Sequence, residues 1–288
     1  MASALVATAA ALAGCGSAAS TGSPPGHPLQ GRPLQVAVSV YPLAQLVSYI
    51  GAGDVHVVDL APPGTQPRGL ALGPAQRAVM RSAGLVIAVG DGYQPQVEAA
   101  AKSAHRYLAV LPAVSRQAQP YEFWLDPYLM AKAAPVIAGA LTVADPEGRQ
   151  QFQSGSLDFQ SVAASIESDF ESTFTQCQDS YFVTADDAFG RMAAAFDLFD
   201  VPVTSAGVNY AVNTLSVRNL ASVFSEVGVP LGSLRQVALL AHVSVKSLDP
   251  MELAPALGAS GPSYFAVMEK DLTAMEGPLD CDTTDNYS

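Results

Sequence analysis

One long helical segment divides this chain of 288 residues into two halves. Between Pro146 and Gln176 no proline follows the first residue, so nothing in the stretch interrupts a helix. Its apolar side chains recur three or four positions apart, at Phe159, Val162, Ile166, Phe170 and Phe174. That spacing predicts a single amphipathic helix. A helix of this length suits a rigid connector between two lobes, and we place that connector at residues 146–177.

Short apolar runs alternate with helical patterns on both sides of the connector. Strands are expected before it at 34–40, 54–60, 85–89 and 107–111, with helices at 43–50, 73–82 and 127–143. After it we expect strands at 181–184, 201–203 and 243–248, and helices at 188–199, 215–227 and 264–275. This alternation predicts an α/β fold with two Rossmann-like lobes, each built on a parallel sheet, at 34–145 and 178–288.

The start of the chain is typical of an exported protein. Residues 1–14 are mostly Ala, Val and Leu, which predicts a signal peptide too short to span a membrane permanently. They end in Leu-Ala-Gly-Cys, which resembles a bacterial lipoprotein signal in which Cys15 becomes the lipidated first residue. Residues 16–33 are rich in Gly, Ser, Pro and Ala, so 15–33 is expected to be a lipidated cysteine with a flexible tether.

We therefore expect the protein to be anchored to the outer face of the cytoplasmic membrane. The alternative is an apolar N-terminal helix with an incidental cysteine. In favour of that alternative, no Lys or Arg precedes the apolar run; an upstream start codon would also explain this gap.

Charge argues against one class of partner, and the cysteine content indicates a disulfide. The 26 acidic residues outnumber the 14 basic ones, giving a net charge of −12, which disfavours nucleic acid as a partner. Apart from Cys15, the chain has only Cys177 and Cys281. Two such cysteines in an oxidising compartment favour a disulfide that ties the C-terminal tail to the second lobe. Two buried thiols are the alternative.

Four candidate site residues lie where predicted strands end or helices begin. Arg68 closes the segment PPGTQPR after the second strand, and Glu122 precedes the turn WLDP at the start of a helix. Asp186 follows the strand at 181–184, and Asp249 follows the strand at 243–248. Loops at the C-terminal ends of parallel strands converge on a crevice. We therefore expect these four side chains to face one cleft.

Several segments resemble one known family. The motifs PPGTQPR (62–68), EFWLDP (122–127) and ADDAFG (185–190) are similar, in order and spacing, to motifs of the metal-specific solute-binding proteins of ABC importers, the zinc and manganese type called cluster A-I. The resemblance extends from about Val36 to Cys281. It implies two lobes joined by a long helix, a Zn²⁺ or Mn²⁺ ion bound between them, and an ABC permease as partner. It also implies a monomer and no enzymatic activity.

The chain departs from the family at the metal ligands. The resemblance implies histidine at the positions of Arg68, Glu122 and Asp186, and only Asp249 has the expected residue. Arg68 cannot ligate a metal, because its guanidinium stays protonated and has no lone pair to donate. None of the four histidines of the chain falls at these positions: His27, His56, His105 and His242.

Two interpretations of this residue set remain open. Glu122, Asp186 and Asp249 are oxygen ligands that would suit Mn²⁺, Ca²⁺ or Mg²⁺ if Arg68 turned aside. Alternatively, Arg68 takes the place of the cation and pairs with the carboxylates, so that no metal is bound. The second is favoured, because a fixed positive charge about 4 Å from a divalent ion costs roughly 8 kcal/mol at an effective dielectric near 20.

The sequence thus predicts an extracytoplasmic substrate-binding lipoprotein of a metal-ion ABC transporter with a degenerate metal site. The alternative is a paralogue that binds no metal and acts as an accessory or interaction lipoprotein, with Arg68 replacing the cation. We expect no enzyme, because the chain has no G-x-S-x-G, Walker or H-E-x-x-H motif.

Overall fold

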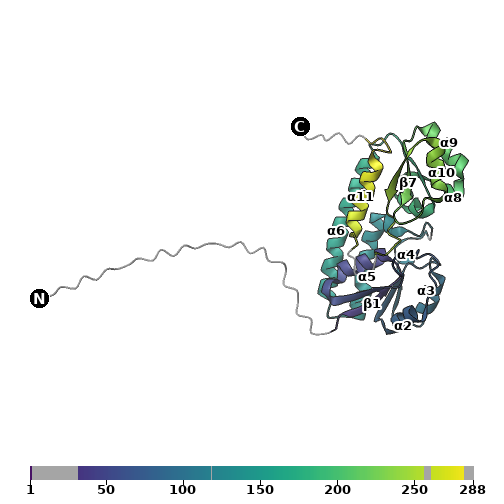
Figure 1. Ribbon diagram of the computed structural model, residues 1–288. Coiled ribbons are helices and arrows are strands. Elements are labelled where there is room, and N and C mark those ends of the chain that lie inside the picture. Colours follow the sequence, from purple (N-terminus) through teal and green to yellow (C-terminus); the bar gives the residue numbers. More distant parts are fainter. Residues whose placement is uncertain (2–31, 118, 256–260, 282–288) are drawn as a thin grey trace.

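Two α/β lobes are stacked along one long helix, Arg149–Phe174, in the computed structural model (Figure 1). The structure describes residue 1 and residues 32–117, 119–255 and 261–281. The predicted signal peptide from its second residue on, Cys15 and nearly all of the tether lie outside these residues. The prediction of an α/β fold with two parallel sheets and a long connecting helix is confirmed.

The first lobe contains a four-stranded parallel sheet in the order β2-β1-β3-β4. Its elements are β1 (Leu34–Val38), α1 (Tyr41–Gly51), η1 (Ala52–Asp54), β2 (Val55–Asp59), α2 (Pro74–Ser82), β3 (Leu85–Ala88), α3 (Pro95–Ala101), β4 (Tyr107–Ala109), α4 (Leu111–Val114), η2 (Phe123–Leu125) and α5 (Pro127–Ala144). In the register of the central strand, Val36 pairs with Val57 on one side and Leu85 on the other. The four residues of β3 are fully buried, as expected for a central parallel strand.

The second lobe repeats the same topology, with a parallel sheet in the order β6-β5-β7-β8. Its elements are β5 (Tyr181–Thr184), η3 (Asp187–Phe189), α7 (Gly190–Ala195), β6 (Phe199–Pro202), α8 (Val203–Ala206), α9 (Val208–Arg218), β7 (Ser222–Glu226), α10 (Gly232–Ala241), β8 (Ser244–Leu248) and α11 (Tyr264–Glu276). Counted within each lobe, both sheets have the strand order 2-1-3-4. The two halves are therefore a structural repeat.

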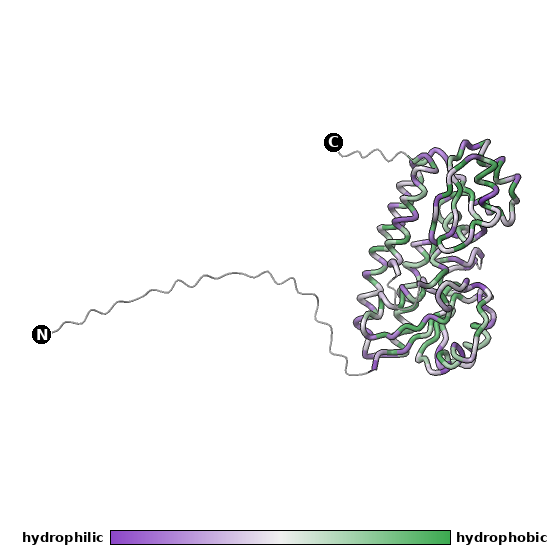
Figure 2. The backbone as a smooth tube through the Cα atoms, in the orientation of Figure 1, coloured by the Kyte–Doolittle hydropathy of each residue, from purple (hydrophilic) through white to green (hydrophobic). Residues whose placement is uncertain are grey.

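The long helix α6 (Arg149–Phe174) lies between the two lobes in the sequence and packs along both. It runs beside α11 in Figure 1 and also contacts α1 and α5. The buried faces of these helices join one hydrophobic cluster that includes Trp124 of the first lobe and Phe224 of the second. Hydrophobic and hydrophilic residues alternate along α6 and α11 in Figure 2, and for α6 this is the amphipathic pattern that the sequence predicts. One continuous core therefore crosses the lobe boundary.

Helix α5 has eighteen residues and is, among the described residues, the one helix long and apolar enough to cross a membrane by length and composition alone. Its buried face includes Met130, Ile137 and Leu141, which belong to the core beside α6. A core helix of a globular protein meets the same criteria. Asp126 caps its first turn by accepting a hydrogen bond from the backbone N–H of Leu129 at 3.1 Å.

The helix predicted at 215–227 is wrong beyond Arg218, because the structure places the buried strand β7 there. Helix α9 ends at Arg218, and Asn219 follows in the left-handed conformation at φ 56°. The spacing of Leu220, Val223 and Val227 imitates a helix, and the serines of the strand hide its buried character. Ser222 hydrogen-bonds to Ser244 of β8 at 2.8 Å, so the neighbouring strand satisfies its hydroxyl.

In the same lobe, the helix predicted at 188–199 is longer than the helix that the structure has there. A short turn, η3, precedes α7, which ends at Ala195. Asp197 then adopts a positive φ of 53°, and the chain enters strand β6 at Phe199. The ring of Phe199 stacks on Tyr181 of β5 with centroids 4.6 Å apart, a cross-strand contact that favours the strand over a longer helix.

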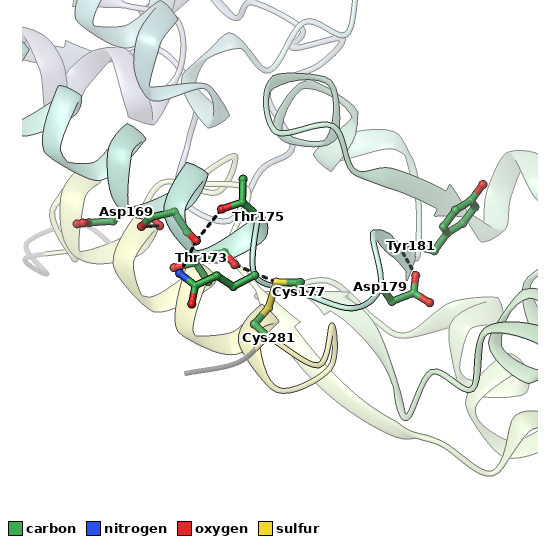
Figure 3. Close-up of a disulfide and its surroundings, with 9 residues drawn as sticks. Asp169, Thr173, Thr175, Cys177, Asp179, Tyr181 and Cys281 are labelled. Carbon is green, nitrogen blue, oxygen red and sulfur yellow. Dashed lines mark hydrogen bonds between the residues drawn. A yellow bond between two sulfur atoms is a disulfide. The ribbon is translucent and has the colours of Figure 1, made fainter. Parts of the chain in front are cut away.

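The ends of α6 and α11 are joined covalently. Cys177 follows α6, Cys281 follows α11, and the two form a disulfide that closes a loop of 104 positions (Figure 3). Beside it the backbone N–H of Gln178 donates to the carbonyl of Asp280 at 3.1 Å. Asp179 accepts a hydrogen bond from the N–H of Tyr181 at 2.7 Å, where β5 begins. The end of the described chain is thereby fixed near the start of β5 in the second lobe.

Candidate functional site

An ion pair between Arg68 and Glu122 lies where loops of the two lobes meet, a region that we call the cleft. Arg68 lies on the loop after β2, and Glu122 directly precedes η2. The Arg68 guanidinium donates from Nη2 to Oε1 of Glu122. Its Nη1 lies 3.7 Å from Oδ2 of Asp187, which belongs to the second lobe. Arg68 therefore connects the two lobes.

The two ends of this pair differ in exposure. The Glu122 side chain is fully buried, whereas 42% of the Arg68 side chain is exposed. Burial raises the pKa of Glu122 above its ordinary value, and the Arg68 charge acts against that rise. Burial acts to lower the pKa of Arg68, but the neighbouring Glu122 and Asp187 carboxylates raise it, so the guanidinium stays charged. A buried carboxylate is thus neutralised by a permanent cation of the chain itself.

Two tyrosine rings lie beside the Arg68 guanidinium. Its Cζ atom is 5.7 Å from the ring centroid of Tyr93 and 5.5 Å from that of Tyr121. At these distances the ring faces attract the cation. The Tyr93 hydroxyl in turn lies 3.5 Å from Oε1 of Glu252. The aromatic pair restricts the directions in which Arg68 can turn.

The loop that carries Arg68 is held by specific backbone contacts. The Gln94 side-chain amide donates to the carbonyl oxygens of Pro67 and Ser39, each at 3.0 Å. Gly64 and Gly69 have φ values of 67° and 78°, which side chains with a Cβ rarely adopt. The N–H of Gly64 also donates to the carbonyl of Ala254 in the second lobe at 3.2 Å. The proline-rich and glycine-rich sequence therefore builds a fixed turn that projects Arg68 into the cleft.

The structure brings together only part of the predicted set. Asp186 caps η3, and its Oδ1 accepts from the N–H of Ala188 at 3.1 Å. Its neighbour Asp187 is the residue that approaches Arg68. Asp249 uses Oδ1 to accept from the N–H of Met251 at 2.9 Å, a local turn contact. Within the described residues, no group of three or more His, Cys, Asp or Glu is arranged to hold a metal ion.

Two further acids of the cleft, Glu226 and Glu252, are not predicted from the sequence. Glu226 is the last residue of β7, is 4% exposed, and has no hydrogen-bond partner on either carboxylate oxygen among the described residues. Burial, followed by the neighbouring Asp186 carboxylate, raises the pKa of Glu226 to about 8. Burial and then Glu122 raise the pKa of Glu252 to about 7. The raised pKa values disfavour the charged forms of both acids in the folded protein.

Each missed acid has a specific cause. The apolar spacing at 215–227 predicts a helix for the segment of Glu226, and this prediction hides its position at the C-terminal end of a strand, where ligands bind. Glu252 lies three positions after Asp249 on the loop that follows β8, and the local turn directs Asp249 to the backbone. A correct strand assignment at 222–226 would have identified Glu226.

Comparisons with known proteins agree on one family. A model of the family described as zinc-uptake complex component A, periplasmic (ZnuA) matches residues 36–277. The chain is 21% identical over 303 residues to the high-affinity zinc uptake system protein ZnuA of Bacillus subtilis strain 168, which covers 93% of each protein. It is 22% identical over 162 residues to the zinc-binding protein AdcA of Streptococcus pyogenes serotype M1, which covers 53% of this chain and 32% of AdcA.

Solved structures show the same fold. The Zn(II)-bound ZnuA-like domain of AdcA from Streptococcus pneumoniae superposes with a TM-score of 0.75 at 18% identity, covering 86% of this chain and 99% of that domain. The laminin-binding protein Lmb of Streptococcus agalactiae, described as having adhesin and metal-transporting activity, gives a TM-score of 0.76 at 18% identity. It covers 86% of this chain and 99% of Lmb. At these identities the likeness establishes the architecture.

Proposed function

The chain belongs to the family of periplasmic zinc-uptake component A proteins, and on that premise we propose that it is an accessory component of a metal-ion ABC importer that binds no metal in its cleft. Arg68 takes the place of the cation. The lobes then present a closed surface to the permease without cargo. This is the interpretation that the residue contacts support best.

The contact between Arg68 and Glu122 carries the proposal. The guanidinium already occupies the hydrogen-bonding capacity of one Glu122 oxygen and reaches Asp187 of the other lobe. A divalent ion about 4 Å from this fixed charge would meet a repulsion of roughly 8 kcal/mol at an effective dielectric near 20. One oxygen donor of the candidate site would also have to give up its present partner.

Contacts between the lobes support a cleft that stays closed without a ligand. The indole N–H of Trp124 in the first lobe donates to the carbonyl of Pro250 in the second at 2.8 Å. The N–H of Gly64 donates to Ala254, and the two lobes share a hydrophobic core along α6. A binding protein without its ligand needs an accessible cleft, whereas here hydrogen bonds within the chain already join the two lobes.

A second candidate function is capture of a cation, favoured by the buried carboxyl group of Glu226, whose two oxygens have no hydrogen-bond partner among the described residues. If the half-exposed Arg68 turned to solvent, Glu122, Asp186 and Asp249 would supply oxygen donors for a hard cation. Such a site would require rearrangement, because Asp186 and Asp249 now accept bonds from the backbone.

Metal analysis of protein purified without chelator, followed by titration with Zn²⁺ and Mn²⁺, tests the proposal. We expect no stoichiometric metal and no sub-micromolar binding. Stoichiometric, sub-micromolar binding that is lost in both Glu122→Ala and Asp186→Ala would overturn the accessory function. Asp169→Ala is the matched control, because this exposed carboxylate lies on α6, outside the cleft.

We also propose an extracytoplasmic location with a lipid anchor at Cys15 and docking on an ABC permease. The periplasmic family supports the location, and the Leu-Ala-Gly-Cys motif supports the anchor. Metabolic labelling with a fatty-acid analogue tests the anchor, with Cys15→Ser as the control. If the protein is an accessory component, its binding to the reconstituted permease will not change when EDTA is added.

A further inference from the structure

A second arginine, from the other lobe, holds the loop on which Glu122 lies. Arg191 is the second residue of α7 and is only 4% exposed. Its Nη2 donates to the carbonyl oxygen of Gln117 at 3.2 Å and to that of Pro120. These carbonyls belong to the first-lobe segment that immediately precedes Tyr121 and Glu122. One buried side chain of the second lobe thus satisfies two backbone acceptors of the first.

Two carboxylates of the first lobe act on the charge of Arg191. Burial lowers the pKa of Arg191, and the carboxylates of Asp126 and Glu122 act against that decrease. Asp126 and Glu122 belong to the first lobe, so first-lobe carboxylates favour the charged form of Arg191 in the second lobe.

The packing beneath the loop is close. A Cβ atom placed on Gly190 would lie 3.0 Å from Cγ of Pro120, nearer than most real Cβ contacts. Gly190 has an ordinary helical φ of −59°, so the close approach of the loop, and not the backbone conformation, accounts for the glycine. The loop therefore rests directly on the first turn of α7.

The same segment is held again a few residues later. Trp124 follows Glu122 by two positions, is fully buried, and donates to the carbonyl of Pro250. Glu122 thus lies between two attachments to the second lobe, Arg191 before it and the Trp124 indole after it. Neither attachment requires anything bound in the cleft.

We propose that Arg191 is a positioning residue of the cleft, which holds Gln117 and residues 119–122 on the second lobe and so keeps Glu122 within reach of Arg68. The inference deepens the proposed function, since it explains how the cleft keeps its shape without a ligand. The role of Arg191 is tested on protein treated with EDTA, in which no metal is bound. The inference about Arg191 can therefore fail while the accessory function stands, and the accessory function can fail while the inference stands.

The single tryptophan of the chain reports on this loop. Because the protein contains only Trp124, its intrinsic fluorescence arises from the segment that Arg191 holds. In Arg191→Met, which removes the donors but keeps a long side chain, we expect the emission to shift to the red. We also expect acrylamide quenching of Trp124 to rise about twofold or more, because a loosened segment opens locally to solvent.

Arg218→Met is the matched control. Arg218 lies in the same lobe and is 41% exposed, and among the described residues it pairs with Asp179 at 3.9 Å and with the ring of Tyr181, both outside the loop that precedes Glu122. Its emission and quenching should equal those of the wild type. Hydrogen exchange measured on the peptide covering 119–125 should accelerate in Arg191→Met and stay unchanged in Arg218→Met.

If Arg191→Met does not fold, Arg191→Lys replaces it. A lysine can donate to one of the two carbonyls with a compact charge, so exchange at 119–125 should be intermediate between wild type and full loss. The inference is overturned if a folded Arg191 variant keeps wild-type quenching of Trp124 and wild-type exchange at 119–125. A role in global stability alone would lower the unfolding free energy and leave both native-state readouts unchanged.

Discussion

The guanidinium of Arg68 donates a hydrogen bond to the buried carboxylate of Glu122, 54 positions away in the sequence. The same guanidinium approaches Asp187 of the second lobe. In a fold whose relatives include a Zn(II)-bound domain, a side chain thus supplies the positive charge at the centre of the cleft.

Removal of Arg68 should destabilise the protein through Glu122. Arg68→Met leaves a fully buried carboxylate without its partner, and we expect the unfolding free energy to fall by about 1–3 kcal/mol, a value reduced because Arg68 is partly exposed. The loss should shrink as pH falls, because Glu122 then takes up a proton. Urea unfolding at pH 5 and pH 8 measures the difference.

The double variant Arg68→Met with Glu122→Gln isolates the pair. It should recover most of the lost stability, because the amide carries no charge to be neutralised. Arg218→Met should cost less than about 1 kcal/mol, since Arg218 is 41% exposed and its Nη1 lies 3.9 Å from Asp179, at the long end for an ion pair. An equal cost for both arginines would contradict a special role for Arg68.

Stability should decrease as pH rises from about 5 to about 8. Burial raises the pKa of Glu226 from 4.5 to about 8 and that of Asp200 from 3.8 to about 7. The folded protein therefore holds protons that the unfolded chain has released, so the stabilisation is complete below the unfolded pKa and lost as pH passes the folded pKa. Thermal unfolding across this range measures the slope.

Glu226→Gln should reduce this slope. The fall in unfolding free energy between pH 5 and pH 8 should be about 1–2 kcal/mol smaller than in the wild type, because the amide does not ionise. Glu171→Gln on the exposed face of α6 is the control and should leave the slope unchanged. Stability that rises steadily to pH 8 in the wild type would show that Glu226 is not a buried, protonated acid.

Loss of the disulfide should loosen the C-terminal helix. The bond between Cys177 and Cys281 closes 104 positions, so Cys177→Ser with Cys281→Ser should lower the unfolding free energy by about 2–4 kcal/mol. Reductant should lower the stability of the wild type by a similar amount and leave the double variant unaffected. A wild type that is insensitive to reductant, with two free thiols by mass, would contradict the bond.

The sequence pattern was sufficient where apolar periodicity was strong. The spacing of Phe159, Ile166 and Phe170 predicts the helix that the structure places at Arg149–Phe174. The proline-rich turn and its position after a strand placed Arg68 in the cleft. These features depend on local chemistry, which the order of residues records directly.

Other features depended on tertiary contacts. Strand β7 reads as a helix because Ser222 and Ser225 break its apolar run, and only the neighbouring strand shows how their hydroxyls are satisfied. Which of the adjacent Asp186 and Asp187 turns toward Arg68 depends on the capping bond that Asp186 makes to Ala188. The sequence alone does not determine either outcome.

The most direct test is calorimetric titration of Zn²⁺ into the wild type and Arg68→His at neutral pH, with Arg68→Gln as the control. We expect no specific binding to the wild type or to Arg68→Gln, and stoichiometric binding to Arg68→His. An imidazole there would supply a nitrogen donor beside the freed carboxylate of Glu122. Stoichiometric binding of Zn²⁺ to the wild type that Arg68→His does not strengthen would contradict the claim that Arg68 replaces the cation.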